Sequence, residues 1–95
     1  MDHNEARQIL RQELMKYRTR SYIELIRLVG ADPPTLVIQG ASGTEYQIEI
    51  HIHWDGKDGG DVYVIGSIDD GGWRAFLPLT EHFIARRHDV ISASW

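Results

Sequence analysis

The chain of 95 residues contains no cysteine. This absence excludes a disulfide-stabilised scaffold and any zinc or redox site that is held by thiolates. No apolar run approaches the roughly 20 residues that a membrane-spanning helix needs. The first residues, MDHNEARQIL, lack the basic and apolar segments of a signal peptide. We therefore expect a cytoplasmic protein with no membrane partner.

The composition is that of an ordinary globular domain, with 42% apolar and 25% charged residues. This length suits one hydrophobic core and is too short for two. We predict a single α+β domain over residues 1–95, made of a helical part (1–30), an antiparallel sheet (35–79) and a C-terminal tail (80–95). No cofactor is predicted.

Charge is divided unevenly along the chain, although the net value is only −4. Residues 1–30 carry six basic and four acidic side chains, giving +2, whereas residues 31–95 carry four basic and ten acidic ones, giving −6. Arg7, Arg11 and Arg18 line up along the first helix, but no glycine loop or interleaved aromatics accompany them. We interpret this row as a solvated edge and expect no nucleic-acid partner.

Apolar periodicity predicts two helices in the first part. Apolar side chains recur at spacings of four, four and three along the first helix, which gives one buried stripe. Ser21 is followed three residues later by Glu24, the pattern of a capping box, in which each residue accepts a hydrogen bond from the other's backbone N–H. A second helix is predicted over residues 22–29, closed by Gly30 in a C-terminal cap.

The period changes to two after the proline pair at 33–34. Apolar side chains occupy the even positions from 46 to 54 and polar ones the odd positions from 45 to 55, which predicts a strand with one buried face. Glycine-rich turns on either side predict hairpins. The expected fold is two N-terminal helices packed on one face of a four-stranded antiparallel meander, whose last strand lies in WRAFLPL. The tail is expected to hold one helical turn at 81–84 and a short closing strand at 90–93.

Several strings resemble a group of small bacterial hypothetical proteins. They are GTEYQIEI (43–50), GSIDDGGWRAF (66–76) with PLT (78–80), and RSYIEL (20–25). Together they lie within a span that covers most of residues 20–84. Those proteins typically have a Pro-Asp-Gly turn and a last strand after the position of Phe83-Ile84, where this chain has ARRHDV. The resemblance supports the α+β fold and implies no activity.

The string HIHWD places His51, His53 and Asp55 on one face of a strand. Side chains at i and i+2 lie about 7 Å apart at their Cα atoms, so the histidines could both reach a zinc ion, with Asp55 as a third ligand. If Trp54 faces Val62, however, the residues opposite the histidines are Tyr63 and Ile65, a poor outer shell for a metal. A metal-dependent enzyme or metal-binding protein is therefore the alternative interpretation.

The acidic residues favour no catalysis. Asp55, Asp58 and Asp61 belong to the turn at one end of a strand about 26 Å long, and Asp69 and Asp70 belong to the turn at the other end. The two groups lie too far apart to act as one acid–base pair. No serine stands in a nucleophile-elbow string.

An apolar cluster on the sheet face away from the helices is the stronger signal. With Asp70-Gly71 as a two-residue turn, Ser67 would face Arg74 and Ile65 would face Phe76. Tyr63, Ile65, Arg74 and Phe76 would then form an interaction surface, covered either by Phe83, Ile84 and Trp95 of the tail or by another chain. We expect a non-enzymatic protein-interaction module that self-associates or binds a protein partner, for example as an inhibitor or immunity-like protein.

Overall fold

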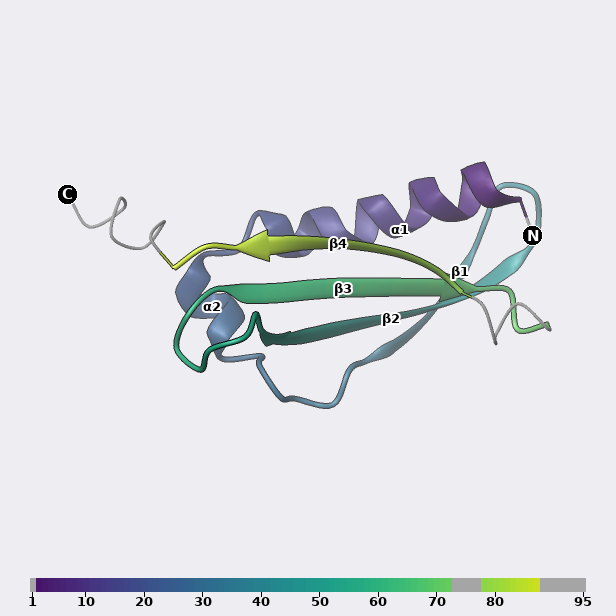
Figure 1. Ribbon diagram of the computed structural model, residues 1–95. Coiled ribbons are helices and arrows are strands. Elements are labelled where there is room, and N and C mark those ends of the chain that lie inside the picture. Colours follow the sequence, from purple (N-terminus) through teal and green to yellow (C-terminus); the bar gives the residue numbers. More distant parts are fainter. Residues whose placement is uncertain (1, 73–77, 88–95) are drawn as a thin grey trace.

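The computed structural model describes residues 2–72 and 78–87. Two helices precede a four-stranded antiparallel sheet with the strand order β1-β2-β3-β4, and both helices lie on the same side of the sheet (Figure 1). The predicted α+β meander is confirmed. The elements are α1 (His3–Arg18), α2 (Tyr22–Ile26), β1 (Thr35–Gln39), β2 (Glu45–Trp54), β3 (Val62–Asp69) and β4 (Leu79–Ala85).

Helix α1 starts at Asp2, whose carboxylate accepts hydrogen bonds from the backbone N–H groups of Asn4 (3.0 Å) and Glu5 (3.1 Å). These bonds satisfy two of the amides that a helix leaves open at its start. The predicted apolar stripe faces the sheet, where Ala6, Leu10 and Leu14 are fully buried or nearly so. None of the described helices is long and apolar enough to cross a membrane.

Helix α2 begins with the predicted capping box. The Ser21 hydroxyl accepts from the Glu24 N–H at 3.2 Å, and the Glu24 carboxylate accepts from the Ser21 N–H at 3.2 Å. The helix is shorter than predicted, because it ends at Ile26 and tighter turns follow, in which backbone N–H groups bond to carbonyls three residues back. Gly30 has a φ of 78° as expected of a cap, and its N–H donates to the Ile52 carbonyl at 3.3 Å.

The inner face of the sheet, turned toward α1 and α2, holds the core. On β2 the even positions from 46 to 52 are buried as predicted, with Tyr46, Ile48 and Ile50 exposed by 0–2%, and Trp54 is half-buried. Trp54 faces Val62 in the β2–β3 hairpin, so the predicted register there is confirmed. Gly66 lies close to α1, since a Cβ atom built on it would lie 2.7 Å from Leu10 Cδ1.

The Tyr46 hydroxyl takes part in a hydrogen-bonded network at the edge of this core. The Tyr46 hydroxyl donates to Glu5 Oε1 at 2.8 Å, and Ser42 Oγ donates to the same oxygen at 2.6 Å. Burial, followed by the hydrogen bond to Glu5, raises the pKa of Tyr46 to about 12, while the Ser42 hydroxyl and then Tyr46 lower the pKa of Glu5. The network joins the start of α1 to the β1–β2 hairpin.

The third hairpin differs from the prediction. The last described strand is β4 (Leu79–Ala85), so the helical turn expected at 81–84 is wrong and the sheet extends into the expected tail. Ser67 faces Thr80 and Ile65 faces His82, in place of the expected Arg74 and Phe76. The turn after β3 also differs, because the side chains of Asp69 and Asp70 accept from the N–H groups of Gly71 and Gly72. The closing strand expected at 90–93 lies outside the described residues.

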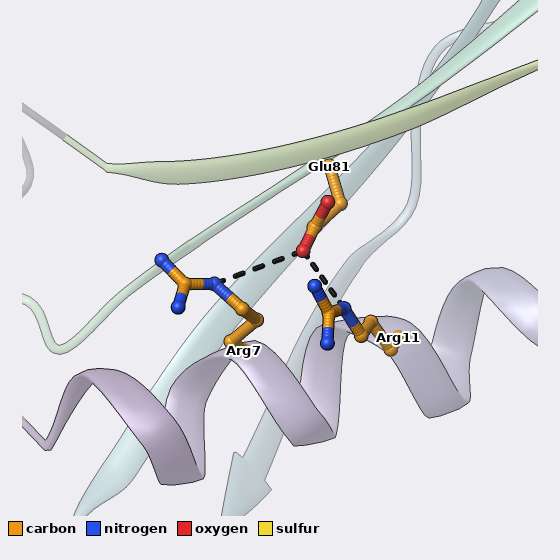
Figure 2. A network of polar contacts seen from close by, with 3 residues as sticks. All are labelled: Arg7, Arg11 and Glu81. Atoms are coloured by element: carbon orange, nitrogen blue, oxygen red, sulfur yellow. Dashed lines mark hydrogen bonds and ion pairs between the residues drawn. The ribbon is translucent and has the colours of Figure 1, made fainter.

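An inward-pointing charge explains why β4 is hard to identify from its sequence. Glu81 lies among the inner-face positions of this strand and contacts Arg11 Nε at 2.9 Å and Arg7 Nε at 3.7 Å (Figure 2). The Arg18 guanidinium lies 4.6 Å from the centre of the Phe83 ring. The basic row of α1, interpreted above as a solvated edge, therefore holds the helix against the edge strand.

Candidate functional site

The candidate site is the outer face, which we define as the sheet surface turned away from α1 and α2. Its strands place side chains in rows that cross the sheet. One row is His53–Tyr63–Ile84, the next is His51–Ile65–His82, and the third is Glu49–Ser67–Thr80. Each row combines odd positions of β2 and β3 with even positions of β4. The reason is that odd-numbered residues of β3 pair with even-numbered residues of β4.

Ring contacts link these rows. The Tyr63 and His82 rings stack with their centres 5.1 Å apart and an interplanar angle of 27°. The rings of His51 and His53 stack at 6.0 Å and 19°. Tyr63, Ile65 and Ile84 form the apolar part of this surface, with His51 and His53 beside it on β2 and His82 beside it on β4.

Much of the outer face is open to solvent in the described part of the chain. The side chains of Val37 and Ile84 are exposed by 59% and 38%, and Tyr63 and Ile65 are half-buried. Across the described segments, no helix or strand lies over this side of the sheet (Figure 1). Apolar groups gathered on one side of a small sheet are typical of a surface that contacts another molecule.

The two histidines proposed as metal ligands do not form a chelating site with Asp55. His51 Nε2 lies 3.1 Å from Glu49 Oε2, and its ring is stacked on that of His53. Asp55 is exposed in the turn after β2. Within residues 2–72 and 78–87, no group of three or more His, Asp or Glu side chains is placed to hold a metal ion.

Two of the four residues predicted to form an interaction surface have a described position on the outer face. Tyr63 and Ile65 lie on the outer face, whereas Arg74 and Phe76 lie outside the described residues. Phe83 and Ile84 do not cover the surface as expected. Phe83 packs against the core on the inner side, and Ile84 is itself part of the outer face. Trp95 is outside the described residues.

Sequence reasoning missed His82 and Ile84. The signal was present, since Thr80, His82 and Ile84 alternate with Leu79, Glu81 and Phe83, but the charge of Glu81 at an inner position concealed it. Val37, the outward residue of β1, was also missed.

Other polar regions of the described chain offer little for catalysis. A hollow of about 580 Å³ runs along the exposed side of α1, and its described lining is amides, Met15 and two arginines. These groups supply no pairing of a nucleophile with a base. The Asp70 carboxylate has a lowered pKa because it accepts the Gly72 N–H, which is the role of a turn residue.

No protein-family model, curated protein or solved structure matches this chain. Its outer face combines apolar side chains, which gain free energy when water is excluded, with imidazoles, which can donate or accept hydrogen bonds. Such a surface is suited to binding another macromolecule.

Proposed function

We propose that this chain is a non-enzymatic protein-interaction module whose binding surface is the outer face. The observation that carries the proposal is the row structure of that face. Tyr63, Ile65 and Ile84 lie side by side on β3 and β4, and His51, His53 and His82 flank them. The partner is another protein or a second copy, and binding as an inhibitor is one form that the function can take.

The size of the face supports a protein partner. Strands of about eight residues at ~3.3 Å each, four abreast at ~4.8 Å, give a surface of roughly 26 by 19 Å. Specific interfaces bury about 800 Å² of accessible surface on each partner. The flat area of this face, roughly 500 Å² by these spacings, can thus supply the central part of such an interface, without the concavity that small ligands prefer.

Composition gives further support. Interface centres favour aromatic side chains and contain few charged ones. The two rows that hold Tyr63 and Ile65 have no lysine, arginine or carboxylate, whereas the third row and the strand ends carry the acidic groups. An apolar centre with a polar rim is the usual layout.

Photo-crosslinking in cells tests this proposal. Ile65 is replaced with the photoreactive amino acid p-benzoylphenylalanine, and Ile23, exposed by 48% on α2, receives the same replacement as a matched control. We expect a discrete crosslinked product from position 65 and none from position 23. Products from neither position, or only from position 23, would contradict the proposal.

A further inference from the structure

Strand β4 has one open edge in the described part of the chain, where β3 pairs with its other side. Backbone groups of successive residues in a strand point to opposite sides. The Asp55 N–H donates to the Asp61 carbonyl across the β2–β3 turn, so the odd-numbered residues of β3 bond to β2 and the even-numbered ones bond to β4. The N–H and C=O groups that point to the open edge of β4 are therefore those of Thr80, His82 and Ile84.

A groove lies between α1 and β4 at this edge of the sheet. It encloses about 280 Å³, and its described lining is Arg11, Leu14, Met15, Arg18 and Glu81. Met15 is exposed by 55%, so the groove opens to solvent. Helix α1 runs alongside β4 (Figure 1). An open strand edge of this kind can accept an extended peptide, which is held by backbone hydrogen bonds while its side chains contact the neighbouring surface.

Arginine side chains give the groove a positive charge. Arg7, Arg11 and Arg18 share one face of α1, since four and seven residues make about one and two turns. The Nε atoms of Arg7 and Arg11 face a single oxygen of Glu81, at 3.7 and 2.9 Å, and the terminal nitrogens of Arg7 point away from it (Figure 2). These two side chains are exposed by 43% and 66%. Their remaining N–H donors are suited to further carboxylates.

The spacing of the arginines suits alternate residues of a strand. Along the axis of α1, Arg11 lies about 6 Å and Arg18 about 16 Å beyond Arg7. Side chains at every second position of a strand are about 6.6 Å apart, so three of them span about 13 Å. Carboxylates at three alternate positions of an added strand are thus within reach of the three long arginine side chains.

We infer that β4 and α1 bind an extended acidic peptide segment of another protein, which is added antiparallel to β4 with its carboxylates toward the arginines. A second copy of the chain fits this edge less well, because it would bring the arginines of its own α1 to those of the first copy. Antiparallel pairing is slightly more stable per residue than parallel pairing. This surface is separate from the outer face, so the inference does not rest on the proposed function.

Fluorescence anisotropy with a labelled synthetic heptapeptide tests the inference. The peptide alternates glutamate with valine, begins and ends with glutamate, and is titrated with the purified full chain. A matched peptide has lysine in place of each glutamate. We expect the acidic peptide to bind about tenfold or more tightly than the lysine peptide. The net charge of −4 on the whole chain would favour the opposite order, so this preference would come from the groove.

Methylated peptides test the backbone hydrogen bonds. In the antiparallel arrangement the valines lie opposite Thr80, His82 and Ile84 and donate their N–H groups to β4, whereas the N–H groups of the glutamates point away. N-methylation of the valines should weaken binding about tenfold or more, because these hydrogen bonds are lost. N-methylation of the glutamates should weaken it far less.

A pair of variants tests the arginines. Arg11→Gln in the groove and Arg27→Gln at the exposed C-terminal end of α2 change the net charge by the same amount. We expect only Arg11→Gln to weaken binding of the acidic peptide, by about fivefold or more. Because the Arg11 side chain is largely exposed, both variants should remain folded, which circular dichroism checks.

Four results would overturn the inference. They are an acidic peptide that does not bind at millimolar protein, equal binding of the acidic and lysine peptides, equal losses from the two methylated peptides, and equal effects of Arg11→Gln and Arg27→Gln. Photo-crosslinking from position 65 probes a different face of the sheet, so the proposed function can fail or stand independently of these results.

Discussion

The two faces of the sheet are built from alternate residues of the same strands, yet they are completed differently. On β2 the inner side chains of Tyr46, Ile48 and Ile50 are buried beneath α1, whereas His51 and His53, which follow them on the same strand, face outward. The alternation of a strand assigns side chains to faces but does not say which face will be covered. In this chain the helices cover the inner face, which provides stability, and we propose that the outer face binds a partner.

Matched truncations on the two faces should give the largest difference in the free energy of unfolding. Ile48 is fully buried, and Ile48→Ala is expected to lower the free energy of unfolding by about 2–5 kcal/mol because burial is lost and a cavity remains. Ile65→Ala, the same change on the half-buried outer side, should cost less than half as much. Urea denaturation at neutral pH measures both, and equal losses would show that the outer face is also covered within the chain.

Gly66 and Ser67 are neighbours on β3 and give a second comparison of the inner face with the outer face. In Gly66→Ala the new methyl group would lie 2.7 Å from Leu10 Cδ1 and 2.9 Å from Ile50 Cδ1, so side chains of α1 and β2 must move. Overpacking of this kind costs about 1–3 kcal/mol. Ser67→Ala, one residue along and on the outer face, should change stability little. The close approach of α1 would be disproved by a Gly66→Ala variant as stable as the wild type in thermal melts.

Removal of the Glu81 charge on the inner face should have the smallest effect on stability. Glu81→Gln weakens the contacts with Arg7 and Arg11, and because these groups are partly exposed we expect a loss of only about 0.5 kcal/mol. High salt should reduce the difference from the wild type. The control is Glu49→Gln on the outer face. Urea denaturation at low and high salt would contradict this account if Glu49→Gln cost more than Glu81→Gln.

Most of the fold could be predicted from local patterns. The capping box of Ser21 and Glu24, the alternation from 46 to 54 and the register of Trp54 on Val62 each depend on neighbouring residues or one short turn, and the structure has all three. Tyr63 and Ile65 were placed on the outer face for the same reason.

The fourth strand could not be found in this way. A glutamate at an inner position breaks the apolar alternation, and the partners of Glu81 are arginines on α1, about 70 residues earlier in the chain. The residues next to Glu81 in the sequence do not indicate such a contact. The two-residue turn assumed at Asp70-Gly71 then fixed a wrong register, because Ile68 pairs with Leu79 and the carboxylates of Asp69 and Asp70 accept hydrogen bonds from backbone amides. His82 and Ile84 were missed in consequence.

The most direct test of the outer face as the interface is NMR on the unmodified, isotope-labelled chain at about pH 5.5. Backbone amide shifts are followed as the protein concentration rises from micromolar to millimolar. We expect the signals that move to belong to the central rows of the outer face, in β2, β3 and β4 around His51, Ile65 and His82. Signals from the exposed side of α1, such as those of Gln8 and Gln12, should stay in place. Spectra that do not change with concentration would reject a second copy as the partner. Shifts confined to α1 would contradict the account.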